Sequence, residues 1–145
     1  HQAASGRRLH VIAEDHRNLA AMIAPPDQGG WGLDAVWADD FHHEMRVLLS
    51  NAHENYYARY DGSMVALAAA INDGFSPVTT ACADVPSIAA ADPARAFVFC
   101  IQNHDQIGNR AFGDRLNHQI GLDAYRAASA LLSVTLYSTS PALQP

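Results

Sequence analysis

Short apolar runs, each bounded by polar or turn-forming residues, recur at wide intervals along this chain. Runs at 9–13, 33–38 and 96–102 have the length and composition of buried parallel strands, which are apolar on both faces because helices cover both sides of the sheet. A shorter run at 134–137 has the same character. The pattern therefore predicts four strands.

The segments between the runs carry apolar residues at the spacing of amphipathic helices. Helices are predicted over three ranges, 41–50, 63–72 and 123–132. Asp39 or Asp40 is expected to cap the first helix and Ser63 the second, because their side-chain oxygens accept hydrogen bonds from the free N–H groups of a first turn. Segments 51–61 and 74–93 lack a clear period and are expected to be loops.

Strands that alternate with helices are typical of βαβ units, which build a parallel sheet. Four strands in this order correspond to half of an eight-stranded barrel. We therefore predict an α/β protein with a partial (β/α)8 TIM barrel, folded as one half-barrel domain over 1–145. A half-barrel leaves strand edges and an apolar face without partners, so we expect completion by dimerisation as a homodimer or by association with a complementary half-barrel.

Composition and charge narrow the classes of function. With 49% hydrophobic residues, the 145-residue chain has enough apolar material for a core. The net charge of −6 comes with no basic run, which argues against binding to nucleic acid. No stretch of about 18 apolar residues and no signal-peptide pattern occur, so no membrane association is expected. Cys82 and Cys100 predict two free thiols in a reducing compartment, the cytoplasm.

Two of the predicted strands end on side chains capable of acid–base chemistry. Glu14 follows the first run, and Asn103-His104-Asp105 follows the third. The carboxyl ends of parallel strands meet at one edge of the sheet, where α/β proteins place their active sites. Glu14 and Asp105 are therefore the candidate catalytic residues, with His104 as a donor to a hydroxyl or to a developing charge.

Each candidate also has a structural interpretation. Glu14 could cap a helix or form a surface ion pair with Arg17, and Asp105 could cap the segment that begins near Gly108. Asp34 lies in the middle of the second apolar run, and we interpret it as a structural residue.

Three segments carry a resemblance to a known family. They read VIAEDHRN at 11–18, GWGLDAVWADDFHH at 30–43 and QNHDQIGNR at 102–110. In this order they resemble maltooligosyltrehalose trehalohydrolase, a family in the α-amylase clan of glycoside hydrolases. The Asn-His-Asp motif occurs throughout that clan, whereas the Asp-Asp-Phe-His-His block is specific to the trehalohydrolase branch. The resemblance extends over nearly the whole chain.

The resemblance implies a (β/α)8 barrel that hydrolyses the α-1,4 bond next to a terminal trehalose unit and releases trehalose with retention of configuration. By motif, Glu14 matches the acid/base position and Asp105 the third-carboxylate position. The chain would then supply strands 5–8, the C-terminal half of the catalytic barrel. The family's nucleophile aspartate lies upstream of the Glu14 strand and outside this chain, which opens at His1, so we expect a fragment of a longer protein. No cofactor is implied.

Retaining hydrolysis needs two carboxyl groups about 5–5.5 Å apart, one that attacks as an anion and one that donates a proton. A carboxyl group serves as the acid near neutral pH only in an apolar or anionic setting. Glu14 ends an apolar run beside Asp15, which would provide such a setting. Asp105 would hydrogen-bond sugar hydroxyls and favour the oxocarbenium-like transition state.

Four potential metal ligands, Asp39, Asp40, His42 and His43, fall within five residues. Neighbouring side chains on a helix diverge by about 100°, so the four cannot all converge on one ion. Contacts with a sugar are therefore favoured for these residues, and no metal site is expected.

Aromatic and basic residues offer further contacts with a sugar. Four aromatic side chains could stack on sugar faces, although such side chains are as often core residues: Trp31, Trp37, Tyr56 and Tyr57. Of these, Trp37 and Tyr57 are the candidates for the site. Arg110 is expected to contribute to the same site, and it could pair with Asp105 or Glu14.

Three classes of function remain open at this point. The first is a glycoside hydrolase of the trehalohydrolase type. The second is a catalytically incomplete carbohydrate-binding remnant, favoured by the missing nucleophile. The third is an unrelated metal-dependent hydrolase built on the block of aspartates and histidines. Release of trehalose by the wild type and by Glu14→Gln separates the first from the second, and metal analysis decides the third.

Overall fold

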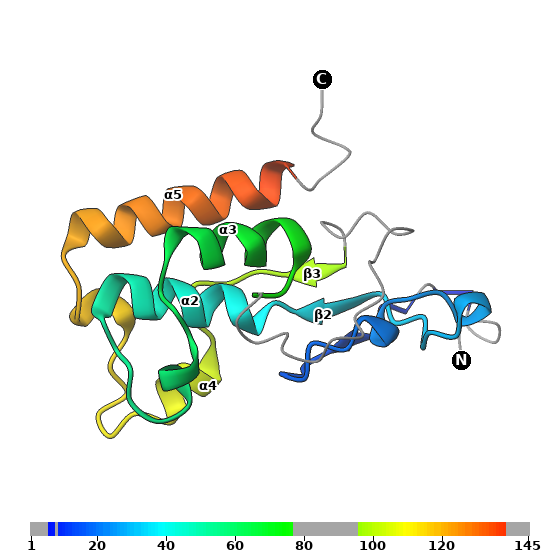
Figure 1. The fold of residues 1–145 in the computed structure, drawn as a ribbon, viewed down its shortest axis with the longest axis horizontal. Helices are drawn as coiled ribbons and strands as arrows, with labels where there is room; N and C mark the ends of the chain where they lie inside the picture. The colour runs from blue at the N-terminus through cyan, green and yellow to red at the C-terminus, as the bar shows by residue number, and fades with distance from the viewer. Residues whose placement is uncertain (1–5, 8, 77–95, 139–145) are drawn as a thin grey trace.

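A small parallel sheet lies at one end of a layer of helices (Figure 1). The computed structural model describes residues 6–7, 9–76 and 96–138. The strands are β1 (Ile12–Ala13), β2 (Ala35–Trp37) and β3 (Phe97–Val98). They pair in the order β1–β2–β3, with Ile12 opposite Ala35 and Val36 opposite Phe97. The predicted parallel sheet and its first three strands are confirmed, over fewer residues than the apolar runs.

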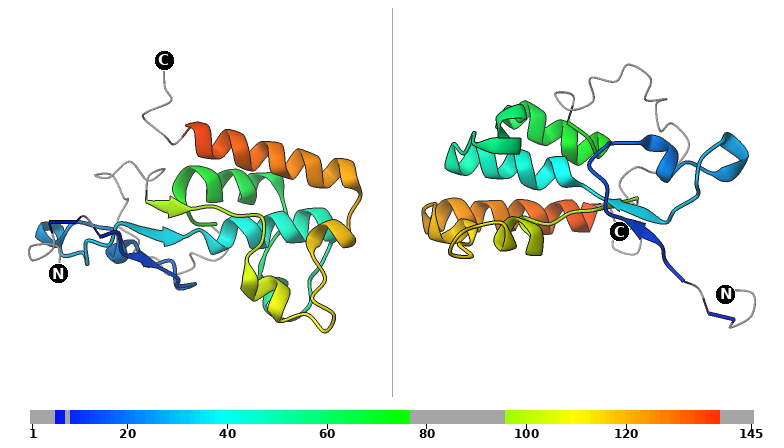
Figure 2. Two further views of the ribbon diagram at one scale, coloured as in Figure 1. Left: turned by 180° about the vertical axis from the view of Figure 1, so that it is seen from behind. Right: turned by 90° about the horizontal axis from the view of Figure 1, so that it is seen from below.

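Three longer helices pack together beside the sheet (Figures 1 and 2). Helix α2 (Asp39–Ser50) continues directly from β2, and α3 (Met64–Asp73) packs against it. Helix α5 (Leu122–Ser138) runs alongside both, as Figures 1 and 2 show from three sides. The short α4 (His104–Gly108) follows β3. None of the helices in the described part of the chain is long and apolar enough to cross a membrane.

Aromatic side chains from the sheet and the helices form the centre of the core. Phe41 on α2 meets Phe99 edge to face at 5.2 Å, and Phe75 meets Phe97 at 5.1 Å between ring centroids. Around them pack the buried residues Met22, Val36, Met45, Leu67, Ala70, Leu116 and Ala128. Full burial of one large apolar side chain stabilises a fold by roughly 1.5–3 kcal/mol. This cluster therefore holds α2, α3 and α5 to the strands.

The predicted beginning and end of α3 are confirmed. The Ser63 hydroxyl accepts a hydrogen bond from the Ala66 N–H at 3.1 Å, as an N-cap does. Gly74 ends the helix with a φ of +79°, in the left-handed region that favours glycine. A Cβ atom at this position would lie 2.0 Å from the Phe97 ring. Only glycine therefore lets α3 end so close to β3.

The predicted cap of α2 is wrong. The N-cap residue is Ala38, which makes no side-chain cap, and both Asp39 and Asp40 lie in the first helical turn. The chain passes from β2 into α2 with no turn in between, so neither aspartate has the extended backbone of a capping residue. Their charges still favour the positive end of the helix dipole.

The predicted fourth strand at 134–137 is also wrong, because these residues belong to the last turns of α5. Two side-chain hydroxyl groups of α5 donate hydrogen bonds to backbone carbonyl groups one turn earlier. Ser129 donates to the Tyr125 carbonyl at 2.9 Å, and Thr135 donates to the Leu131 carbonyl at 3.0 Å. A β-branched residue loses only a few tenths of a kcal/mol in a helix that is already formed. The apolar run therefore continues the helix.

Two predicted loops have different outcomes. The segment 51–61 contains a short 3-10 helix, η3 (Asn55–Arg59), which carries two of its tyrosines. Most of the segment 74–93 lies outside the described residues, and so does Cys82. Cys100 is a free thiol, and burial raises its pKa to about 11.

Strand β1 is more exposed than its apolar composition suggested. Among the described strands it has a neighbour, β2, on one side only. Leu9, Val11 and Ile12 are 45%, 54% and 49% exposed, so the expectation of a buried strand is wrong for the described part of the chain. Asp34 holds the strand in place, since its Oδ2 accepts a hydrogen bond from the Val11 N–H at 2.8 Å. Asp34 is thus a structural residue as predicted, although it lies just before β2 and not in the middle of a strand.

Candidate active site

The ends of all three strands meet around one pocket of about 290 Å³. Glu14 follows β1, Asp39 follows β2, and Asp105 follows β3 at the start of α4. The lining residues are Glu14, His16, Asp39, His43, Tyr56, Arg59, Asn103, Asp105 and Gln106. The structure therefore brings Glu14 and Asp105, the two candidates from the strand ends, to the same pocket.

Glu14 is exposed and lies at the rim of this pocket. The ion pair that sequence reasoning offered to it is formed by Asp15 instead, which accepts from Arg17 Nε at 2.9 Å. Arg17 also lowers the pKa of Asp15. Among the described residues Glu14 makes no hydrogen bond and no ion pair, so its carboxyl group is available to a ligand.

Asp105 is held by the first turn of α4. Asn103 is the N-cap of this helix, and its side-chain oxygen accepts from the Asp105 N–H at 2.9 Å. One carboxylate oxygen of Asp105 accepts from Asn109 Nδ2 at 2.7 Å. The alternative role for Asp105, as the cap of a segment near Gly108, is wrong because α4 ends at that glycine. His104, the first residue of α4, is exposed and does not line the pocket.

Asp39 has the most unusual carboxyl group of the pocket. Burial raises its pKa to about 6, and the nearby negative charges of Glu14, Asp40 and Asp105 add to the effect. Its side chain is 15% exposed. A carboxyl group that holds its proton up to this pH can donate a hydrogen bond to a ligand below pH 6 and accept one above it.

His42 and His43 both stay neutral, because burial lowers the pKa of His42 to about 4 and that of His43 to about 2. His43 lines the pocket, and its Nδ1 lies 2.8 Å from the Tyr60 hydroxyl. Its Nε2 is buried and has no hydrogen-bond partner among the described residues. Such an atom is rare in folded proteins and marks a place where a ligand can complete the bonding.

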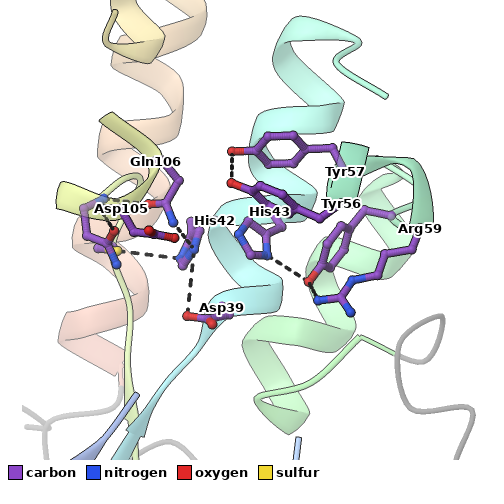
Figure 3. A network of polar contacts seen from close by, with 11 residues as sticks. Asp39, His42, His43, Tyr56, Tyr57, Arg59, Asp105 and Gln106 are labelled. Atoms are coloured by element: carbon purple, nitrogen blue, oxygen red, sulfur yellow. Dashed lines mark hydrogen bonds and ion pairs between the residues drawn. The ribbon is translucent and has the colours of Figure 1, made fainter. Parts of the chain in front are cut away.

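An aromatic wall closes the side of the pocket opposite Asp105 (Figure 3). Tyr56 and Tyr57 lie 4.2 Å apart between ring centroids, and their hydroxyl groups are hydrogen-bonded at 2.8 Å. Tyr56 is 40% exposed and lines the pocket, whereas Tyr57 is buried behind it under the Arg46 guanidinium. Sequence reasoning favoured Tyr57 as a sugar contact, whereas Tyr56 is the tyrosine that lines the pocket.

Several other predicted site residues lie outside the pocket. Trp37, the last residue of β2, is half-buried and does not line it. Arg110 pairs with Asp114, with 3.9 Å between Nε and Oδ2, so the pairing suggested with Glu14 or Asp105 is wrong. Asp40 is buried and accepts hydrogen bonds through Oδ2 from Asn18 Nδ2 and the Ser76 N–H. Within the described ranges, no three His, Cys, Asp or Glu side chains gather as a metal site requires.

The chain is similar to known proteins over most of its length. No family model matches it. The malto-oligosyltrehalose trehalohydrolase of Deinococcus radiodurans is 45% identical over 130 residues, which are 84% of this chain. The enzyme of the same name from Rhizobium sp. is 42% identical over 137 residues, or 90% of the chain. The chain is homologous to one part of the malto-oligosyltrehalose trehalohydrolases. It spans about a fifth of their length, 21% and 22% of these two relatives.

A solved structure agrees with this relationship. The putative α-amylase of Salmonella typhimurium superposes with a TM-score of 0.69 at 37% identity, over 90% of this chain and 23% of its own. The fold is therefore an α/β fold similar to part of an α-amylase. The resemblance to the trehalohydrolases that the three motifs carried is confirmed.

Sequence reasoning missed four pocket residues: His16, Arg59, Asn103 and Gln106. A signal for the last two was present, since Asn103 and Gln106 have the spacing of a capping box, which ties the start of a helix to its third residue. Arg59 gave no signal, because it lies in a segment without periodicity. The trehalohydrolase motifs cover Asn103 and Gln106 but not Arg59.

Proposed function

We propose that this chain forms one side of the active site of a retaining glycoside hydrolase. Its reaction is cleavage of the α-1,4-glucosidic bond next to a terminal trehalose in maltooligosyltrehalose, with release of trehalose. The observation that carries the proposal is the meeting of Glu14 and Asp105 at one pocket. The names of the relatives support the choice of substrate.

In this proposal Glu14 is the general acid and base, and Asp105 binds sugar hydroxyls beside the bond that breaks. Protonation of the leaving oxygen by Glu14 is followed by activation of water by the same group. The nucleophile that attacks the anomeric carbon is an aspartate outside these 145 residues. Support for Glu14 comes from its position at the rim and from its lack of other partners among the described residues.

Contacts with the substrate are assigned to the residues that line the pocket. Asp39, His43 and Tyr56 face the same space as the two carboxylates. A sugar hydroxyl both donates and accepts, so it suits a neutral imidazole whichever nitrogen carries the proton. Asp40, His42 and Tyr57 are buried behind this layer and would support it without touching the sugar.

We further propose that the three strands occupy neighbouring positions in a TIM barrel that another segment or a second copy of the chain completes. Val11, just before β1, and Ile12 on β1 are about half exposed, and the strand has a described neighbour on one side only. An unpaired strand edge with apolar side chains favours the addition of another strand. The added strand would carry the missing nucleophile to the pocket.

The test is release of trehalose from maltooligosyltrehalose by the product of the complete reading frame. Glu14→Gln removes the acid and base while it keeps the shape of the side chain, so we expect kcat to fall by about 10²–10⁴-fold. Glu54→Gln, which changes an exposed glutamate that does not line the pocket, is the matched control and should keep activity within about twofold.

Two outcomes would contradict the proposal. Glu14→Gln with more than a tenth of wild-type kcat would remove Glu14 from the mechanism. A wild type that binds the oligosaccharide, as calorimetry would detect, but never releases trehalose would instead be a carbohydrate-binding protein.

A further inference from the structure

A chain of buried side-chain contacts joins the two helices that carry Asp39 and Asp105. Gln106 on α4 lies next to Asp105, and its Nε2 is 3.0 Å from His42 Nε2 on α2. His42 lies one helical turn after Asp39, and its Nδ1 is 3.7 Å from the Cys100 sulfur, which follows β3. Figure 3 shows His42 between the side chains of α4 and Asp39. His42 and Gln106 are 2% and 7% exposed.

The capping box of α4 fixes the direction of these hydrogen bonds. The Asn103 N–H donates to Gln106 Oε1 at 2.8 Å, which orients the amide group. The NH2 group of Gln106 is therefore the part that faces His42, and it can only donate. His42 Nε2 must then accept with its lone pair, so the single proton of this neutral imidazole lies on Nδ1 and points to Cys100.

This tautomer has a consequence for the pocket. His42 Nε2 lies 3.9 Å from Asp39 Oδ1. In this tautomer the nitrogen carries a lone pair and no hydrogen, so it cannot donate a hydrogen bond to the carboxylate. The titratable groups around His42 are Asp39 and His43 on α2, Cys100 after β3, and Asp105 on the neighbouring α4. Burial and the charges of Glu14, Asp40 and Asp105 raise the pKa of Asp39 to about 6, and they outweigh His16, which lines the same pocket and lowers it.

We propose that Gln106 and His42 are positioning residues for the hydrolase, and that their hydrogen bond, with His42 protonated on Nδ1 alone, sets Asp105 and Asp39 across the pocket from each other. This inference rests on the proposed function, because it gives these two buried side chains a part in catalysis. His42 is buried behind the pocket and does not line it, and the part proposed for Gln106, which does line it, is to hold His42. Both act through the helix turns that carry the two carboxyl groups.

The decisive variant is Gln106→Glu, which has nearly the same shape. One carboxylate oxygen still accepts from the Asn103 N–H, but the other now faces the lone pair on His42 Nε2. Where the new side chain is ionised, His42 takes a proton on Nε2, either by exchange of tautomer or as an imidazolium. Nitrogen-15 NMR of the imidazole distinguishes these states, since a protonated and an unprotonated ring nitrogen resonate far apart.

The expected result in the wild type is a protonated Nδ1 and an unprotonated Nε2 on His42 across the range pH 5.5 to about 8. In Gln106→Glu the proton moves to Nε2, and the pH profile of kcat gains an ionisation from His42. A displacement of catalytic groups of about 1 Å costs about 10²-fold, so kcat should fall about tenfold to 100-fold with little change in KM. Gln28→Glu, an exposed glutamine in another turn, controls for the added charge.

A wild-type spectrum with the proton of His42 on Nε2 would overturn the inference whatever the variants do, even if Gln106→Glu failed to fold. Unchanged kcat in folded Gln106→Glu and Gln106→Met, in an enzyme that Glu14→Gln inactivates, would overturn it while the proposed function stood. A wild type without trehalose release would remove the proposed function and the catalytic role of the pair together. The tautomer would then be judged by the spectrum alone.

Discussion

Helix α2 carries carboxyl groups on two faces, and the two faces differ in whether neighbouring residues hydrogen-bond to their polar side chains. On its inner face, Asp40 and Glu44 are 2% and 0% exposed, and described neighbours occupy their oxygens. Glu44 accepts from the Gly62 N–H at 2.7 Å and from the Ser76 hydroxyl at 2.8 Å. Asp40 accepts from the Ser76 N–H at 2.7 Å. These two carboxylates tie the segments after α2 and α3 back to the helix.

The pocket face of the same helix carries Asp39 and His43, one residue before Asp40 and one before Glu44. Here the pKa of Asp39 is raised to about 6, and His43 Nε2 has no partner among the described residues. The fold thus completes the hydrogen bonds of one face and leaves those of the other to a ligand. Residue type does not separate the structural acid from the functional one, but the state of its bonding does.

The largest expected effect is on the inner face. Glu44→Ala leaves the Gly62 N–H and the Ser76 hydroxyl without their acceptor in a dry interior, so we expect a loss of about 3–5 kcal/mol in the free energy of unfolding. Glu44→Gln is the matched control, because its amide can accept from Gly62 and donate to Ser76. Urea denaturation of both variants gives the difference, and equal losses would show that charge, and not hydrogen bonding, matters here.

A smaller effect of opposite sign is expected on the pocket face. Because folding raises the pKa of Asp39 from 3.8 to about 6, ionisation of this group costs stability, which is lost as pH rises through 6. Asp39→Asn should therefore be more stable than the wild type by about 2–3 kcal/mol at pH 8, and by much less at pH 4. Denaturation at both pH values measures this, with the exposed Asp27→Asn as the control for net charge. A difference that did not grow with pH would contradict the account of Asp39.

The smallest effect isolates one bond of the inner face. Ser76→Ala removes the hydroxyl that donates to Glu44 but keeps the N–H that donates to Asp40, so we expect a loss of about 1–2 kcal/mol. Ser133→Ala removes an exposed hydroxyl that bonds only to its own helix, with an expected change within about 0.5 kcal/mol. Thermal unfolding of the pair compares them, and similar melting temperatures would weaken the distinction between the two faces.

The sequence predicted the parallel sheet and the position of Glu14 and Asp105 at one edge of it, because both follow from local patterns. Apolar runs mark the strands, and parallel strands end at one edge. It could not tell Asp39 from Asp40, or Tyr56 from Tyr57. Which of two adjacent residues faces the pocket depends on how the helix is rotated against the sheet, and that is set by packing far away in the chain.

The error at 134–137 has a related cause. Val134 and Thr135 favour strands by composition, yet the helix already begun at Leu122 determines their backbone. Gln106 is the opposite case, since the Asn103–Gln106 spacing of a capping box was present in the sequence. Its link to His42, 64 positions away, was not, because such a contact requires the fold.

The side of β1 that has no neighbour among the described strands has a practical consequence for anyone who prepares this chain. Backbone groups on that side, flanked by Val11 and Ile12, can pair with the same segment of another molecule. Refolding from inclusion bodies at high concentration should therefore favour aggregates that grow strand by strand, and dilution or co-expression with the covering segment should raise the yield.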